Sequence, residues 1–194
     1  MRVVAFNGSP RDRGNTAVVL GVVRDVLESH GISVDLYQLG GSGVSPCKAC
    51  FKCFEKRDGF CVQGDQLNTW LGELYGAHGL IIGSPVYFAA VTPEVKAFID
   101  RVGLCAIAGG YRLKRKAGAA VVAVRRQGAV EVFNQINSLF ALNQMIIPCS
   151  TYWNLGIGAD PGDVLQDQEG METFKVLGEN MAWLLKRLWG VKEG

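Results

Sequence analysis

The apolar run AGAAVVAV at residues 117–124 constrains the fold of this chain more than any other stretch. Its side chains have no polar face, which is typical of a strand buried on both sides at the centre of a parallel sheet. Parallel neighbours need a crossover connection between them, and that connection is usually a helix. The run therefore predicts an α/β fold.

Patterns on either side of this run extend the prediction. Short apolar or alternating runs predict four more strands, at residues 2–6, 33–39, 79–83 and 145–150. Apolar residues at helical spacing predict helices at residues 15–29, 66–75, 93–104, 129–141 and 171–189. Strands and helices that alternate in this way give a parallel sheet with helices on both faces. Residues 40–64 show no period and predict an insertion within a single domain that spans residues 1–194.

Length, charge and hydropathy limit what such a domain does. A chain of 194 residues is long enough for one well-buried domain and too short for two ordinary ones. Its net charge of +2 argues against a nucleic-acid-binding protein, which usually has a strongly basic face. No stretch reaches the ~18 apolar residues of a membrane span, and the first apolar run is too short for a secretory signal. We therefore expect a cytoplasmic protein, without a membrane partner, whose thiols stay reduced.

The first loop, NGSPRDRGNT at residues 7–16, follows the first predicted strand and leads into a helix. A helix N-terminus offers unpaired N–H groups and the positive end of the helix dipole to an anion. The loop adds short donors and a positive charge, from Ser9, Arg11, Asn15 and Thr16. It matches neither a Walker A loop nor a G-x-G-x-x-G loop, and the alternative interpretation is an ordinary polar turn. The pattern favours an anion site.

Two further loops follow predicted strands, at the edge of the sheet where ligands of such folds bind. Residues 83–88 (GSPVYF) end the third strand. A flat heteroaromatic ring needs apolar and backbone contacts of the kind that they offer. Residues 124–128 (VRRQG) end the fourth strand. Arg125 and Arg126 are suited to an anionic ring or a second nucleotide phosphate, and are equally typical of a solvated loop.

The pattern G-S-P-R-x-x-G-N-T after the first strand resembles the phosphate loop of the NADPH-dependent FMN reductase superfamily, which is flavodoxin-like. The resemblance covers nearly the whole chain in the order and spacing of its elements. It implies a three-layer sandwich with a five-stranded parallel sheet in the order 2-1-3-4-5, and bound FMN. The residues implied to bind FMN are Ser9, Arg11, Asn15 and Thr16 at the phosphate, Pro85, Val86, Tyr87 and Phe88 at the isoalloxazine ring, and Arg125 and Gly128 in the third loop. Relatives often have a glycine-rich run in that third loop, so the arginines are a departure.

Four of the six cysteines fall within the insertion, as Cys47-x2-Cys50-x2-Cys53-x7-Cys61. Tightly spaced thiolates on one loop are suited to a metal centre, and a cubane iron–sulfur cluster takes four. The spacing and place resemble those of the iron–sulfur flavoprotein branch of the same superfamily, which implies a [4Fe-4S] cluster on these residues. The alternatives are a zinc site and a set of redox-active thiols. Cys105 and Cys149 lie in helix and strand patterns and are expected to be buried.

These features predict a flavin-dependent oxidoreductase. In that interpretation the cluster and FMN pass electrons from a donor such as ferredoxin to a small-molecule acceptor. We expect no catalytic acid–base residue, because the cofactors supply the chemistry. One alternative is a reductase without a cluster that takes hydride from NAD(P)H and reduces FMN or a quinone. Another is a non-enzymatic, flavodoxin-like electron carrier. The resemblance also implies a homodimer or homotetramer.

Overall fold

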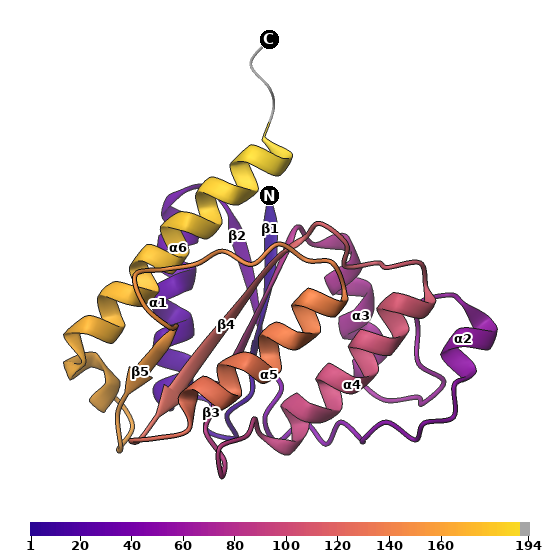
Figure 1. Ribbon diagram of the computed structural model, residues 1–194, viewed down its shortest axis with the longest axis horizontal. Coiled ribbons are helices and arrows are strands. Elements are labelled where there is room, and N and C mark those ends of the chain that lie inside the picture. The colour runs from indigo at the N-terminus through magenta and orange to yellow at the C-terminus, as the bar shows by residue number, and fades with distance from the viewer. Residues whose placement is uncertain (191–194) are drawn as a thin grey trace.

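Five parallel strands form a sheet in the predicted order, β2-β1-β3-β4-β5. The computed structural model describes residues 1–190 (Figure 1). The strands are β1 (Arg2–Asn7), β2 (Ser33–Gln38), β3 (Gly79–Pro85), β4 (Ala117–Val124) and β5 (Leu155–Ile157). The helices are α1 (Asn15–Ser29), α2 (Lys52–Lys56), α3 (Leu67–Gly76), α4 (Pro93–Ala108), α5 (Ala129–Leu142) and α6 (Gln168–Trp189), with a 3-10 turn η1 (Asp163–Gln166) before α6.

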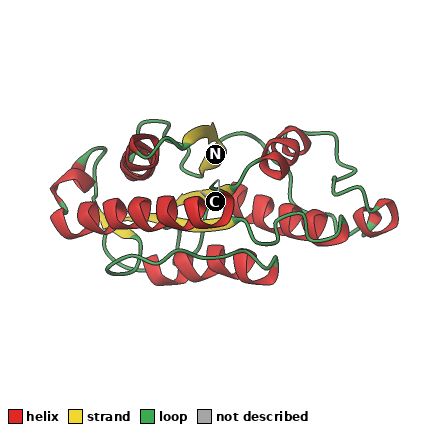
Figure 2. Ribbon diagram, turned by 90° about the horizontal axis from the view of Figure 1, so that it is seen from above, coloured by secondary structure: helices red, strands yellow, loops and turns green. Residues whose placement is uncertain are grey.

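Successive side chains of a strand point to opposite faces of the sheet, so its apolar residues form a core on each face. Helices cover both faces. Val4 and Phe6 of β1 pack with α3, α4 and α5, whereas Val3 and Ala5 pack with α1 and α6. All eight residues of β4 are buried, as its apolar sequence predicts. Figure 2 shows the strands enclosed among the helices. The two apolar cores hold the sheet rigid, so the loops at its edges have fixed starting points.

The fifth strand does not lie at residues 145–150, where the apolar pattern predicts it. Ile146 forms an isolated bridge to the start of β4. Pro148 has no N–H to donate, so pairing cannot continue through it. The chain rejoins the sheet as β5, which pairs with the end of β4. The C-terminal ends of β4 and β5 therefore lie together, beside those of β1 and β3.

The insertion contains one short helix, α2, which shows no period in the sequence. Figure 1 shows α2 at the margin of the molecule, beyond α4 and away from α6.

Cys149, which was expected to be buried in the misplaced strand, is exposed, whereas Cys105 on α4 is buried as expected. Within residues 1–190, none of the helices has the length and apolar character needed to cross a membrane.

Candidate functional site

The first loop connects β1 to α1, at the point where the strand order changes direction. β1 pairs with β2 on one side and with β3 on the other. Such a switch point leaves a crevice at the carboxyl ends of the strands. α1 begins after Gly14 without a side-chain cap and has no acidic residue in its first turn. Its first N–H groups and its dipole are thus available to an anion in the crevice.

Side chains from the ends of β1 and β2 fix the backbone of this loop. Asn7 accepts a hydrogen bond from the N–H of Ser9 and donates one to the side chain of Gln38 at 2.9 Å. Gln38 in turn donates to the carbonyls of Ser9 and Gly40. The Ser9 hydroxyl accepts from the N–H of Arg11 at 3.1 Å. The loop is therefore braced before any ligand binds.

Two glycines allow the loop to pack closely against its neighbours. A Cβ added to Gly40 would lie 2.2 Å from the carbonyl oxygen of Ser9, and one added to Gly8 would lie 2.7 Å from that of Gly83. The Gly8 N–H donates to this Gly83 carbonyl at 2.8 Å. Thr92, the N-cap of α4, donates its hydroxyl to the Gly8 carbonyl at 2.9 Å. The loop after β1 is thus packed against the loop after β2, the end of β3 and the start of α4.

A cavity of about 150 Å³ opens where these loops meet. Seven of the predicted FMN-binding residues line it: Ser9, Arg11, Asn15, Thr16, Pro85, Val86 and Arg125. Pro85 lines this cavity and also a neighbouring one of about 170 Å³, which Tyr87 lines as well. The two cavities share Ser9, Arg11 and Pro85, so the loops after β1, β3 and β4 bound one continuous site.

Phe88 and Gly128 do not line either cavity. Residues 87–90 form a tight hairpin in which Tyr87 and Ala90 exchange both backbone hydrogen bonds. Phe88 and Ala89 at its tip have φ of 48° and 58°, and the Phe88 side chain is fully exposed. Gly128 packs beneath this hairpin, where an added Cβ would lie 3.1 Å from Ala89 Cα.

The fourth wall of the site comes from the loop after β5, which the sequence did not indicate. Gly158 and Ala159 line the cavity. Asn15 donates to the Asp160 carbonyl at 2.9 Å and accepts from the N–H of Gly162 at 2.8 Å. Its amide therefore ties the start of α1 to this loop, across the crevice.

The four cysteines of the insertion line one small cavity. Cys47, Cys50, Cys53 and Cys61 surround a space of about 20 Å³, together with Cys105 of α4. Cys50 is exposed and the other three are half-buried. The backbone between them bends sharply, because Ala49, Phe51 and Arg57 have φ near +50°. A left-handed conformation is costly for such residues and is often found at functional sites.

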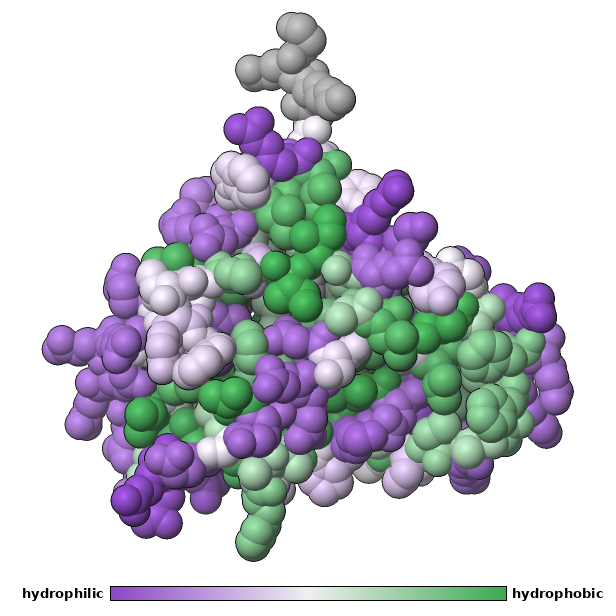
Figure 3. All heavy atoms as spheres, in the orientation of Figure 1, coloured by the Kyte–Doolittle hydropathy of each residue, from purple (hydrophilic) through white to green (hydrophobic). Residues whose placement is uncertain are grey.

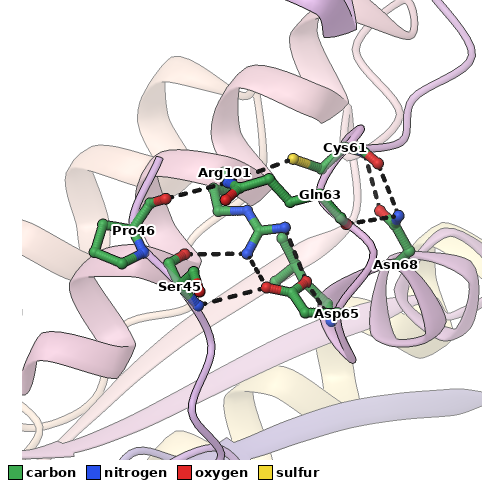
Figure 4. A network of polar contacts seen from close by, with 8 residues as sticks. Ser45, Pro46, Cys61, Gln63, Asp65, Asn68 and Arg101 are labelled. Carbon is green, nitrogen blue, oxygen red and sulfur yellow. Dashed lines mark hydrogen bonds and ion pairs between the residues drawn. The ribbon is translucent and has the colours of Figure 1, made fainter. Parts of the chain in front are cut away.

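Arg101 of α4 closes the cysteine loop at both ends (Figure 4). Its side chain is fully buried and donates to both carboxylate oxygens of Asp65 and to the carbonyl of Ser45. Ser45 precedes Cys47 and Asp65 follows Cys61, so one guanidinium holds both ends of the loop. The Asn68 side chain accepts a hydrogen bond from the Cys61 N–H at 2.9 Å and donates one to the Cys61 carbonyl at 2.7 Å.

The surroundings of the thiols shift their pKa values in opposite directions. Burial acts to raise the pKa of Cys61, but the N–H of Gln63 and the charge of Arg101 outweigh it and lower that pKa. Burial raises the pKa of Cys53 and of Cys105. Within residues 1–190, no three Cys, His, Asp or Glu side chains converge closely enough to hold a metal ion in the observed conformation.

Comparison with known proteins gives the family. The family model for NADPH-dependent FMN reductases matches residues 1–160, which is most of the chain. The chain belongs to the NADPH-dependent FMN reductase family. Its structure is similar to that of a flavodoxin from the domain Archaea, with a TM-score of 0.62 and 17% identity over 96% of this chain and 99% of that one. The flavodoxin-like fold is thereby confirmed.

The relatives also give the branch within the family. An iron–sulfur flavoprotein of Methanocaldococcus jannaschii is 33% identical over 193 residues, covering 96% of this chain and 98% of its own. One from Archaeoglobus fulgidus is 32% identical over 177 residues, covering 90% and 86%. The chain therefore belongs to the iron–sulfur flavoprotein branch and is a flavin-dependent oxidoreductase.

Sequence reasoning missed Arg101, which lies at the thiol cavity. A signal was present, because Arg101 is three residues after Phe98 and four before Cys105, on the buried stripe of α4. A charge at such a position needs a buried partner. The braces Asn7 and Gln38 gave no comparable signal.

Proposed function

We propose that the protein passes electrons from a one-electron donor such as ferredoxin, through a [4Fe-4S] cluster and FMN, to a small-molecule acceptor in the cytoplasm. The observation that carries this proposal is that one chain builds two separate cavities, one at the helix N-terminus and one among four thiols. FMN exchanges one or two electrons and a cluster exchanges one at a time, so the pair would join donors and acceptors of different electron number.

The first cavity suits FMN in its donors. The phosphate would be held by Ser9, Arg11, Asn15 and Thr16, with the first N–H groups of α1. Pro85, Val86 and Tyr87 would contact the ring, and Arg125 would approach its polar edge or the phosphate. Phe88 and Gly128 would act less directly, by shaping the hairpin beside the ring.

The second cavity fits a cluster in the chemistry of its donors. Cys47, Cys50, Cys53 and Cys61 supply four soft thiolate ligands, the number that a cubane takes. The Arg101 Nε–H is buried and has no hydrogen-bond partner among residues 1–190. An unpaired hydrogen-bond donor beside the thiols would be suited to the negatively charged sulfur atoms of a cluster. Room for a cluster requires the thiols to move apart, which the exposed loop of Cys50 permits.

The two cavities lie at different levels of α4. Thr92 at its start contacts the phosphate loop, and Arg101 and Cys105 line the thiol cavity. At 1.5 Å per residue these levels are about 14–20 Å apart along the helix. An apolar groove of about 520 Å³ between α4 and α5, which includes Cys47 and the exposed Leu142, supports the expected homodimer or homotetramer.

The assembly is tested by its mass. Light scattering on the FMN-loaded protein should give two or four chains, because a groove of this kind favours burial against a partner. Leu142→Glu should reduce that mass, whereas Leu165→Glu, at another exposed leucine, should not. A monomer in the unaltered protein would contradict the assembly.

A second candidate is an NAD(P)H-dependent reductase that passes hydride to FMN or a quinone. Membership of the NADPH-dependent FMN reductase family favours it. The exposed Arg125 at the cavity mouth is suited to a nucleotide phosphate. Flavin absorbance separates the two candidates, since reduction by NADPH should be much slower than reduction by ferredoxin if the first proposal holds. Faster reduction by NADPH would favour the second.

The phosphate loop is tested by Arg11→Met. We expect FMN binding to weaken about tenfold or more, because a charged hydrogen bond contributes about 1.5–3 kcal/mol, while riboflavin binding barely changes. The control is Arg13→Met, since Arg13 is exposed in the same loop and lines neither cavity. Titration by flavin fluorescence gives both affinities. Equal losses for FMN and riboflavin would mean that Arg11 does not face the phosphate.

A further inference from the structure

The outer surface of α2 carries an exposed aromatic pair. Phe51 is 59% exposed and Phe54 is 37% exposed, and their ring centroids are 6.3 Å apart. Figure 3 shows pale green, apolar surface bordered by purple, hydrophilic atoms at this margin of the molecule. Aromatic side chains surrounded by charge are typical of protein–protein interfaces.

The charges around this pair are mainly positive. Lys48, Lys52, Lys56 and Arg57 are exposed, against two acidic residues, Glu55 and Asp58. Asp58 pairs with Lys56 at 3.5 Å. Within residues 1–190, Lys48, Lys52 and Arg57 form no ion pair. This concentration of cations is local, because the whole chain has a net charge of only +2.

A groove of about 520 Å³ borders the start of α2, and Lys48 and Lys52 lie on its wall. The groove and the thiol cavity share Lys48, Cys50, Val62 and Gln63 as lining residues. The groove therefore borders the thiol cavity, and Cys50 lies on the wall between them. Asp65, also on the groove wall, is neutralised by Arg101, so the groove presents unpaired positive charge.

We propose that this α2 face, defined as Lys48, Cys50, Phe51, Lys52 and Phe54, docks an acidic one-electron carrier protein. Carboxylates of the carrier contact Lys48 and Lys52, and an apolar patch covers the aromatic pair. The redox centre of the carrier then lies against Cys50, the most exposed of the four thiols. One electron leaves the reduced carrier and enters this protein, and no bond is made or broken. The inference rests on the proposed cluster, because without it the thiol cavity holds no redox centre that could accept an electron from the carrier.

The test uses the protein purified without air and a small acidic ferredoxin as the probe. Lys48→Glu/Lys52→Glu should weaken its binding about tenfold or more at about 0.1 M salt, because charges of opposite sign become charges of like sign. The control is Lys175→Glu/Arg187→Glu on α6, which changes the net charge equally but away from this face. Binding to the control should change much less, since exposed charges are screened over about 10 Å at 0.1 M salt.

Cross-linking of the unaltered protein gives a second measurement that does not depend on a variant folding. A carbodiimide joins a carboxylate of the carrier directly to a lysine, and mass spectrometry locates the bond. Cross-links to Lys48 or Lys52 support the proposal, and cross-links confined to Lys114 or Lys175 would overturn it. Equal binding to both charge variants would overturn it as well. Iron and sulfide analysis of the same samples separates this failure from failure of the proposed function, which a sample without a cluster would show.

Discussion

Single residues determine how firmly the cysteine loop is held, and Arg101 is the clearest case. Burial acts to lower the pKa of Arg101, but the hydrogen bonds to Asp65 and the negative charges of Asp65 and Cys61 outweigh it and raise that pKa. The thiols themselves were readable from sequence, since their spacing is local. The role of Arg101 in bracing them was not predicted, because its partner Asp65 is 36 positions away in the chain.

Replacing Arg101 tests this brace. Arg101→Met should lower the free energy of unfolding by about 3 kcal/mol, because it leaves the Asp65 carboxylate without its partner. Lys96→Met is a matched control on the same helix, since the Lys96–Asp100 pair is exposed and should contribute less than about 1 kcal/mol. Thermal unfolding of the FMN-loaded proteins compares them. Similar small losses for both variants would show that Arg101 does not hold the loop.

Whole elements show where sequence reasoning succeeds and where it fails. β4 was predicted from its apolar run and α1 from its helical periodicity, and the bounds of both agree with the structure. The fifth strand was misplaced because an apolar run favours burial without specifying pairing. The three residues of β5 carry little pattern, and their position depends on backbone pairing with the end of β4. The loop after β5 was missed as part of the site for the same reason.

Gly40 tests how the elements hold the phosphate loop. Gly40→Ala should weaken FMN binding about tenfold or more, because the added methyl would meet the Ser9 backbone, which cannot move aside as a flexible side chain would. Gly72→Ala is the control, since a Cβ there meets nothing within 4 Å. In α3 that change should slightly raise stability. Unchanged FMN affinity in Gly40→Ala would mean that the loop tolerates displacement.

At the scale of the whole molecule, α4 connects the two cavities. Its N-cap Thr92 supports the phosphate loop, and its middle turns carry Arg101 and Cys105 at the thiols. The helix is buried against the sheet through residues such as Phe98. The positions of both proposed cofactor sites are therefore fixed by one rigid element.

The most direct test of this account is the content of iron, acid-labile sulfide and FMN in protein purified without air. We predict about four irons, four sulfides and one FMN per chain, since four thiolates match the ligand number of a cubane. Changing Cys50 to Ala should lower iron and sulfide together while FMN stays bound, because the flavin cavity contains none of the cysteines. Zinc in place of iron, or FMN-loaded protein without iron, would contradict the account.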